Sequence, residues 1–416
     1  GLAPVKSTDV KLEAAFQLGI KAGNLMATYA PYAYEIADII VVDIHLDINK
    51  TNLGDTSSYK FSFGIYEKAL TQVAQVCRED VLIIIETTVP PGTTEKVVHP
   101  LFEKIFAARD LDINKLKLAH SYERVMPGPG YLDSITNFFR VFSAIGEEAK
   151  QATRKFLESF INTGDFPLSE MTRPTASEMA KVLENSYRAM NIAFISEWGR
   201  YAEDAGVNLY EVIDAIRVRP THKNIMWPGF GVGGYCLTKD SLLADWSMKN
   251  LYGNSEGLKN TLKAIEINDM MPRDTVRLIK SKVGSLSGRT ITLMGISYLN
   301  DVADTRYSPA YLFTQICKKE GAEMIFHDPV VDLWEEMKLQ PITELSELAL
   351  KSHDIVVFTV RHKEYLELSA EQMCQYFPNA RVFVDAFNII DAVKAEKLQA
   401  FEKIVVGIGK GNLCKN

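Results

Sequence analysis

The glycine-rich segment around Cys236 is the part of the sequence best suited to nucleophilic chemistry. It reads Pro-Gly-Phe-Gly-Val-Gly-Gly-Tyr-Cys-Leu-Thr-Lys-Asp over residues 228–240. Four glycines in six residues favour neither helix nor strand, so we expect this backbone to lie close to another group. Leu237 to Met248 has a helical pattern, which places Cys236 beside a helix N-terminus and near Lys239. Both neighbours favour a thiolate; a buried, unreactive cysteine in a plain glycine turn is the alternative.

A second candidate group is a pair of polar side chains in a helical segment. Lys181 and Asn185 are four residues apart, so both project from one face of a helix. An ammonium group and an amide can together stabilise a negatively charged oxygen. A solvated lysine on a surface helix is the alternative interpretation.

Two polar loops follow predicted strands in the first part of the chain. Residues 86–95 include Thr87 and Thr88, and residues 121–128 include Glu123. Ligands of open α/β sheets bind beyond the carboxyl ends of the strands, so both loops are well placed to contact one. Plain turns with capping hydroxyl groups are the alternative.

The elements that must position these groups begin with an α/β region. Continuous β-branched runs at 37–42 and 81–85 predict strands buried on both faces of a parallel sheet, with a helix over 63–77 between them. Further short strands are expected at 116–119 and 139–142.

One long amphipathic helix is predicted from about Arg173 to Gly206, with Pro174 in its first turn. The positions that recur at helical spacing are Met179, Val182, Leu183, Ser186, Met190, Ala193 and Phe194. A helix of this length typically bridges domains or forms a dimer seam, and an ordinary core helix is the alternative.

A second α/β region is predicted from Arg289 onward. Its expected strands are 290–295, 322–326, 354–358 and 381–385, with a helix over 310–320. The fold class is therefore α/β, with two Rossmann-like doubly wound domains joined by a long central helix. We expect a dinucleotide domain over 1–170, a central helical domain over 171–285 and a second Rossmann-like domain over 286–416.

The glycine fingerprint of a dinucleotide domain, GxGxxG after a strand, does not occur before Ile39. The run Gly407 to Gly411 follows the last strand and opens no helix, so it does not qualify. We therefore expect the first domain to lack its N-terminal βαβ portion, on the order of 60 residues.

Composition restricts the partners. The net charge is −7, from 46 basic and 53 acidic side chains, and no basic stripe indicates nucleic acid. Five scattered cysteines without a CxxC pattern predict reduced thiols and no zinc site. No apolar run reaches transmembrane length, and no signal-peptide pattern opens the chain. A cytoplasmic protein without a membrane partner is expected.

Taken in order, these segments resemble the UDP-glucose/GDP-mannose dehydrogenase family. The resemblance continues through Gly295 to Tyr298, Asp304 to Pro309 and His327 to Pro329, and so covers nearly the whole chain. It implies oxidation of the C6 alcohol of a nucleotide sugar to a carboxylate, with NAD as cofactor and two NAD per substrate. A homodimer through the central helix and a role in polysaccharide biosynthesis are also implied.

The resemblance assigns roles to individual residues. Cys236 matches the nucleophile that attacks the aldehyde, forming a thiohemiacetal and then a thioester. Lys181 and Asn185 match the groups that stabilise charge on the C6 oxygen. Asp240 matches the position that handles water and protons with Thr88, and Glu123 is its companion acid.

Further ligand contacts follow from the same resemblance. Cofactor contacts are implied for Thr87, Thr88, Lys239 and Arg306. Substrate contacts are implied for Glu123, Arg124, Val125, Met126, Lys181, Asn185, Arg219, His222, Gly233, Gly234 and Cys236, with Lys223 a neighbouring candidate. No metal is expected.

Three places depart from the family pattern. Leu299 and Phe387 stand where basic residues are common, which removes positive charge from the side that holds the nucleotide sugar. Asp43-Ile-His-Leu-Asp47 replaces small residues after a strand; it could ligate a metal, and a solvated strand end is the favoured interpretation.

The expected substrate is a UDP-hexose or UDP-N-acetylhexosamine, with GDP-mannose as an alternative. A nucleotide-sugar-binding protein that has lost NAD and turnover is a competing class; the missing fingerprint and the two lost charges favour it, and the retained candidate residues oppose it. A hydroxyacid or 6-phosphogluconate type of dehydrogenase shares the architecture, but it gives no role to Cys236.

Overall fold

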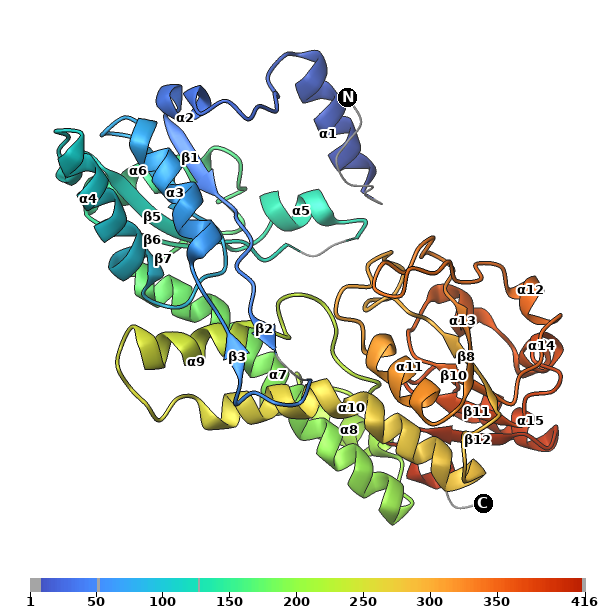
Figure 1. Ribbon diagram of the computed structural model, residues 1–416. Helices are drawn as coiled ribbons and strands as arrows, with labels where there is room; N and C mark the ends of the chain where they lie inside the picture. The colour runs from blue at the N-terminus through green and yellow to red at the C-terminus, as the bar shows by residue number, and fades with distance from the viewer. Residues whose placement is uncertain (1–8, 51–52, 126–127, 414–416) are drawn as a thin grey trace. The chain divides into compact units, whose positions relative to one another are not determined.

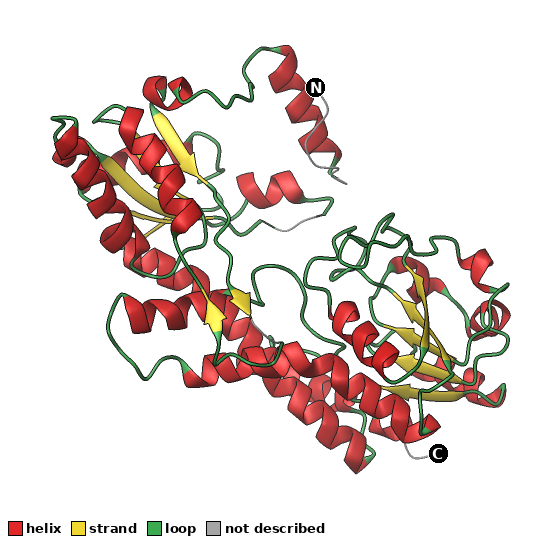
Figure 2. Cartoon of the chain, in the orientation of Figure 1, coloured by secondary structure: helices red, strands yellow, loops and turns green. Residues whose placement is uncertain are grey.

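A computed structural model describes residues 9–50, 53–125 and 128–413, and its contacts divide the chain into two compact units. Unit 1 comprises Gly1–Asn49, Tyr59–Asn185 and Asp240–Leu258, and unit 2 comprises Lys50–Ser58, Ser186–Lys239 and Lys259–Asn416. Both units are α/β, as the sequence predicts (Figures 1 and 2). The three-domain boundaries stay a prediction.

Unit 1 is built on a five-stranded sheet in the order β1-β4-β5-β6-β7. The strands are β1 (Ile39–Val42), β4 (Leu82–Ile85), β5 (Lys117–Tyr122), β6 (Val141–Ala144) and β7 (Ser169–Glu170). β1, β4 and β5 run parallel, as predicted, whereas β6 pairs with β5 antiparallel and β7 runs parallel to β6. The sheet is therefore mixed.

Helices cover both faces of this sheet because successive strand residues point to opposite sides. Ile83 and Ile85 pack with α3 (Gly64–Val76) and α4 (His99–Ala108), whereas Leu82 and Ile84 pack with α6 (Glu147–Glu158).

The edge strand β1 differs from the expectation of burial on both faces. Ile39 and Val41 are 37% and 41% exposed, while Ile40 and Val42 are buried. Within residues 9–38 only helices precede it: α1 (Val10–Lys21) and α2 (Tyr32–Ile36). β1 has one neighbouring strand in the sheet, β4, so one edge of β1 is unpaired, and the face that carries Ile39 and Val41 is left uncovered.

Unit 2 holds an all-parallel sheet in the order β12-β11-β10-β8-β9 (Figure 1). Its strands are β8 (Thr290–Met294), β9 (Glu323–His327), β10 (Ile355–Phe358), β11 (Val382–Asp385) and β12 (Ile404–Gly407). One face packs against α10 (Lys259–Val283) and α11 (Pro309–Lys319), and the other against α14 (Ala370–Tyr376) and α15 (Ala392–Ala400). The chain turns to opposite sides after β8 and β9, so a topological switch point lies between β8 and β10.

The long helix is α7 (Pro174–Ala205), which begins at the predicted proline. Val182, Ala189 and Ala193 are buried along one side, whereas other apolar residues of the helix are exposed. The remaining elements are α5 (Tyr131–Thr136), α8 (Leu209–Arg217), α9 (Asp240–Asn250), α12 (Leu345–Leu348), α13 (Lys363–Glu367), β2 (Asn49–Lys50) and β3 (Tyr59–Lys60).

Candidate functional site

Acidic side chains gather where the parallel strands of unit 1 end. Glu86 directly follows β4 and pairs with the Arg140 guanidinium, and Glu123 follows β5. Burial raises the pKa of Glu86; Arg140 opposes this, and the charges of Asp43 and Glu123 add to it. Sequence reasoning did not single out Glu86, although its place at a strand end was a usable signal.

Lys181 of α7 reaches this acidic group. Its side chain is buried, and its Nζ donates to the Glu123 carbonyl oxygen at 2.8 Å and lies 3.6 Å from the Glu123 carboxylate. The ammonium also lies 5.4 Å from the Tyr122 ring centroid. The structure thus brings two of the predicted catalytic residues together and holds a positive charge in place.

Asn185, one turn further along α7, contacts another predicted residue. Its Nδ2 donates to Oδ2 of Asp240 at 2.6 Å, and Asp240 is fully buried at the first position of α9. Lys181 with Glu123 and Asn185 with Asp240 therefore form two contacts along one helix. The chemical roles of the four residues stay predictions.

The Arg124 side chain forms contacts with other residues of the protein. Its guanidinium pairs with Glu184 and donates to the Tyr122 hydroxyl at 3.0 Å and the Phe139 carbonyl at 3.0 Å. The next residue, Val125, donates its backbone N–H to the Glu123 carboxylate. Met126 lies outside the described residues.

The two threonines after β4 differ in what they contact. The Thr87 hydroxyl accepts from the Ile44 N–H at 2.8 Å and donates to the Val42 carbonyl at 3.2 Å, which ties the ends of β1 and β4 together. The Thr88 hydroxyl bonds to none of the described residues and is half-buried. Of the two hydroxyl groups, that of Thr88 is the one available to a ligand.

Glu178 anchors the loop that contains Thr88. This α7 residue is 1% exposed and accepts from Gly92 N at 2.5 Å, Thr94 N at 2.8 Å and Thr94 Oγ1 at 2.6 Å. Burial raises its pKa to about 7, against the opposing effect of these hydrogen bonds. Glu178 was missed from the sequence because a glutamate in an amphipathic helix usually faces solvent.

The glycine loop of unit 2 packs as closely as predicted. A Cβ on Gly233 would lie 2.5 Å from the Tyr298 Cβ and 3.0 Å from the Tyr307 carbonyl oxygen. A Cβ on Gly234, at φ +82°, would lie 2.9 Å from the Tyr298 ring. Gly234 also donates its N–H to the Arg306 carbonyl at 3.1 Å. The expectation of a close backbone approach is confirmed.

Cys236 is exposed, so the interpretation as a buried cysteine is wrong. It lies in a turn, and the following helix begins at Asp240 instead of Leu237. The turn persists because the Thr238 hydroxyl donates to the Gly234 carbonyl at 3.0 Å, and side-chain bonds of this kind compete with helix formation. Cys236 belongs to unit 2, so its approach to the α7 residues of unit 1 stays a prediction.

Two predicted cofactor contacts flank this loop. Lys239 is buried, with its ammonium 4.4 Å from the Tyr235 ring centroid. Arg306 pairs with Asp304 through Nε at 3.0 Å and Nη2 at 2.7 Å. The Asp304 hydrogen bond raises the pKa of Arg306, and the charge of Cys236 adds a smaller effect.

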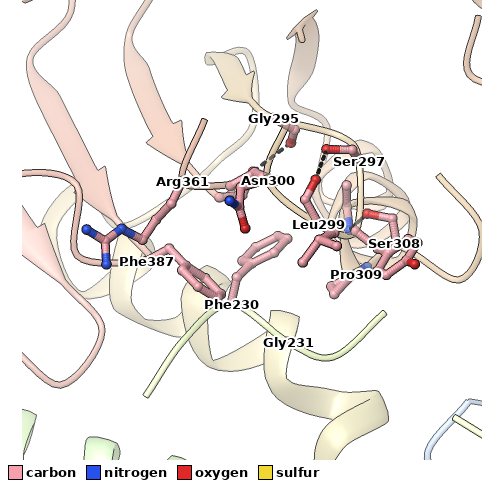
Figure 3. Close-up of a pocket in the computed structure, with 14 residues that line it drawn as sticks. Phe230, Gly231, Gly295, Ser297, Leu299, Asn300, Ser308, Pro309, Arg361 and Phe387 are labelled. Carbon is pink, nitrogen blue, oxygen red and sulfur yellow. Dashed lines mark hydrogen bonds between the residues drawn. The ribbon is translucent and has the colours of Figure 1, made fainter. Parts of the chain in front are cut away.

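A pocket opens at the switch point of the unit 2 sheet (Figure 3). Its walls come from the loops after β8, β10 and β11, the start of α11 and the glycine loop. The lining residues are Phe230, Gly231, Gly295, Ser297, Tyr298, Leu299, Asn300, Ser308, Pro309, Ala310, Thr359, Val360, Arg361 and Phe387. Two of the three departures from the family pattern, Leu299 and Phe387, are among them, whereas Arg219 and His222 are not.

Buried polar groups hold the pocket walls. Asp328 accepts from the backbone N–H groups of Ile296 at 2.8 Å and Ser297 at 3.0 Å. His362, also fully buried, lies 3.3 Å from Asp328 and accepts from Asp301 N at 3.0 Å through Nδ1. These contacts fix the loop after β8 against the loop after β10.

Residues 9–50, 53–125 and 128–413 contain no group of three His, Cys, Asp or Glu side chains that could hold a metal ion. Asp43, His45 and Asp47 thus form no such group. In the same ranges, every helix is too short or too polar to span a bilayer.

Comparison with known proteins identifies the family to which the chain belongs. Three domain profiles of the UDP-glucose/GDP-mannose dehydrogenase family match it: the NAD binding domain over residues 5–161, the central domain over 175–269 and the UDP binding domain over 292–392. The chain belongs to this family, and it is an NAD-dependent nucleotide-sugar dehydrogenase.

Individual relatives share a narrower description. A UDP-N-acetyl-D-mannosamine dehydrogenase of Methanocaldococcus jannaschii is 29% identical over 97% of this chain and 87% of its own length. A UDP-N-acetyl-D-mannosamine dehydrogenase of Pyrococcus horikoshii is 31% identical over 83% of this chain and 77% of its own length. The solved structure of the UDP-D-ManNAc dehydrogenase from P. horikoshii matches with a TM-score of 0.81 at 27% identity, covering 99% of this chain and 90% of that one.

Proposed function

We propose that the protein oxidises the C6 alcohol of a UDP-N-acetylhexosamine to the carboxylate in two successive two-electron steps. The observation that carries this proposal is the exposed Cys236 in a glycine loop of a family member. The N-acetylhexosamine follows from the names of the relatives, several of which are UDP-N-acetyl-D-mannosamine dehydrogenases. A UDP-hexose and GDP-mannose are the alternatives that the test below distinguishes.

Three residues are the proposed contacts of the cofactor in this reaction. The half-buried Thr88 hydroxyl, at the carboxyl edge of the unit 1 sheet, supports contact with NAD. Lys239 and Arg306, which flank the glycine loop of unit 2, are the other proposed contacts. NAD, when bound, supplies a hydride acceptor for each oxidation.

In the first oxidation the C6 hydroxyl loses its proton and C6 loses a hydride, which gives the aldehyde. Lys181 and Asn185 stabilise the negative charge on the C6 oxygen. The buried position of Lys181 supports this role, because a desolvated ammonium acts on a nearby oxyanion more strongly than a solvated one. Asp240 takes up the released proton through water, assisted by Thr88.

In the second oxidation the Cys236 thiolate adds to the aldehyde carbon, forming a C–S bond and a thiohemiacetal. Loss of a second hydride from C6, together with the proton of its hydroxyl group, restores the carbonyl group as a thioester; Asp240 or Glu123 takes up that proton. Water then attacks this carbonyl, the C–S bond breaks, and the thiolate leaves as the carboxylate forms. Glu123 and Asp240 are the acids and bases available to that water.

We also propose that the protein forms a homodimer through α7. Apolar residues spaced three or four apart make an exposed stripe along this helix: Met179, Leu183, Tyr187, Met190, Phe194, Trp198 and Tyr201. A stripe of this size on one face supports a protein interface. Phe194→Glu should yield a monomer by sedimentation velocity, and wild-type protein that sediments as a monomer would contradict the proposal.

The activity is tested by incubating the protein with NAD and a panel of UDP-hexoses, UDP-N-acetylhexosamines and GDP-mannose. We expect NADH and a uronate from a UDP-N-acetylhexosamine. The nucleotide sugar that gives the highest rate of NADH formation identifies the sugar and the base of the substrate. Binding of nucleotide sugars without any NADH would show a non-catalytic binding protein and overturn the proposal.

A further inference from the structure

The pocket of unit 2 contains a single charged side chain among its lining residues, Arg361. Arg361 follows β10, and its side chain lies beside Phe387 at one side of the pocket (Figure 3). It is exposed, and it forms no salt bridge with any residue in the described part of the chain. No lining residue is acidic, so Arg361 supplies the one charge among the lining residues.

The backbone on both sides of Arg361 is fixed. Thr359 donates its hydroxyl to the Gly295 carbonyl at 2.6 Å and its N–H to the Met294 carbonyl at 3.0 Å. On the other side, His362 is buried among the contacts described above. The backbone that carries Arg361 is therefore anchored at the edge of the pocket, and the exposed side chain extends from it.

The rest of the lining fits the uncharged part of a nucleotide. Phe230, Leu299 and Phe387 offer apolar surface to a base, and Asn300 offers an amide. The position at the switch point of a parallel sheet is where nucleotides bind in such folds.

The glycine loop forms one wall of this pocket and leaves no room for larger residues there. A Cβ on Gly229 would lie 2.9 Å from the Phe387 ring, and a Cβ on Gly231, at φ +153°, would lie 2.8 Å from Pro309. Cys236 follows five residues later in the same unit. Ligand pocket and thiol therefore share one continuous loop.

We infer that Arg361 binds the diphosphate of the nucleotide sugar and is the main source of affinity for its charge. A guanidinium presents two parallel N–H donors that match two phosphate oxygens, and it stays charged at all physiological pH values. Leu299 and Phe387, where basic residues are common in the family, cannot supply that charge. This inference rests on the proposed function, since it assumes that the substrate is a nucleoside diphosphate sugar.

The test is isothermal titration of UDP, GDP, UMP and uridine into the full chain and its variants. Arg361→Ala should weaken UDP binding roughly 10- to 100-fold, the range for one charge-assisted hydrogen-bonding group. Uridine binding should not change, and Arg361→Lys should show an intermediate loss because it keeps the charge without the fork. The control, Lys363→Ala, removes an exposed cation two residues away that does not line the pocket and should bind UDP like the wild type.

A second variant relocates the charge. Arg361→Ala combined with Phe387→Arg should recover part of the lost UDP affinity, because the new guanidinium starts from the neighbouring side chain. Unchanged UDP affinity in Arg361→Ala would overturn the inference and leave the proposed function standing. Tighter binding of GDP with the same dependence on Arg361 would support the inference and change only the base. Wild-type protein that binds neither diphosphate would overturn the proposed function, and the inference with it.

Discussion

The two units of this protein place charged groups in opposite ways. At the carboxyl edge of the unit 1 sheet, charged side chains are concentrated and engaged with one another, as Lys181 with Glu123 and Arg140 with Glu86 show. At the corresponding edge in unit 2, the pocket is lined by uncharged residues apart from Arg361. The first arrangement suits proton transfer and charge stabilisation, and the second suits holding a ligand.

This difference predicts distinct kinetic consequences. Changes to the paired groups of unit 1 should lower kcat and leave nucleotide affinity intact, whereas changes to the pocket of unit 2 should alter affinity first. Cys236 is an exception to this division, because it belongs to unit 2 and is the proposed nucleophile.

The largest effect is expected for Cys236→Ser. Without a thiolate the aldehyde cannot become a thioester, so uronate formation should slow by at least about 10³-fold. UDP affinity should stay near the wild-type value. The measurements are uronate yield by mass spectrometry and UDP titration. Full uronate formation by this variant would show that the thiol has no role in the reaction.

Lys181→Ala should give the next largest effect. Loss of the buried ammonium removes stabilisation of the C6 oxyanion, and kcat should fall roughly 10²- to 10³-fold with UDP affinity unchanged. Lys155→Ala, which removes an exposed lysine of α6 in the same unit, is the matched control. A kcat within tenfold of wild type for Lys181→Ala would contradict the assignment of charge stabilisation to unit 1.

Glu178→Gln tests the buried acid that anchors the Thr88 loop. The pKa of Glu178 is raised from 4.5 to about 7 in the folded protein, so its contribution to stability is fully present below pH 4.5. That contribution is lost as the pH rises from 4.5 through 7, because over this range the glutamate is ionised in the unfolded chain but still protonated in the folded protein. Between pH 5 and pH 8 the wild type should lose about 2–3 kcal/mol relative to the variant.

The measurement is urea unfolding of both proteins at pH 5 and pH 8. Parallel pH dependence of the two proteins would show that Glu178 ionises in the folded state as readily as in the unfolded chain.

Gly233→Ala should have the smallest effect. The added methyl group would lie 2.5 Å from the Tyr298 Cβ, so the loop must shift, at a cost of about 1–3 kcal/mol in the free energy of unfolding. Gly130→Ala is the control, since nothing lies within 4 Å of its Cβ position. Equal melting temperatures for the two variants would show that the loop adapts freely.

Much of the fold could be predicted from residue patterns. The β-branched runs gave β1, β4, β8, β10 and β11 nearly to the residue, and the long periodic segment gave α7 from its first proline. The antiparallel pairing of β5 with β6 could not be predicted, because pairing direction is set by connections that short apolar runs do not report. The exposed face of β1 was missed for a related reason: a continuous apolar run does not reveal that the strand is at an edge.

The candidate site was predicted unevenly. Lys181 and Asn185 could be found because helical spacing puts them on one face, and Cys236 because glycines surround it. Glu178 and Arg361 could not, because their importance comes from neighbours distant in sequence: Gly92 and Thr94 for the first, and the pocket lining for the second.

The measurement that tests the central claim most directly is the ratio of NADH formed to nucleotide sugar consumed, with the sugar limiting and NAD in excess. Oxidation through a covalent bond to Cys236 predicts two NADH per sugar, with the uronate as the product. A ratio of one, with an aldehyde or a keto sugar as the final product, would contradict it.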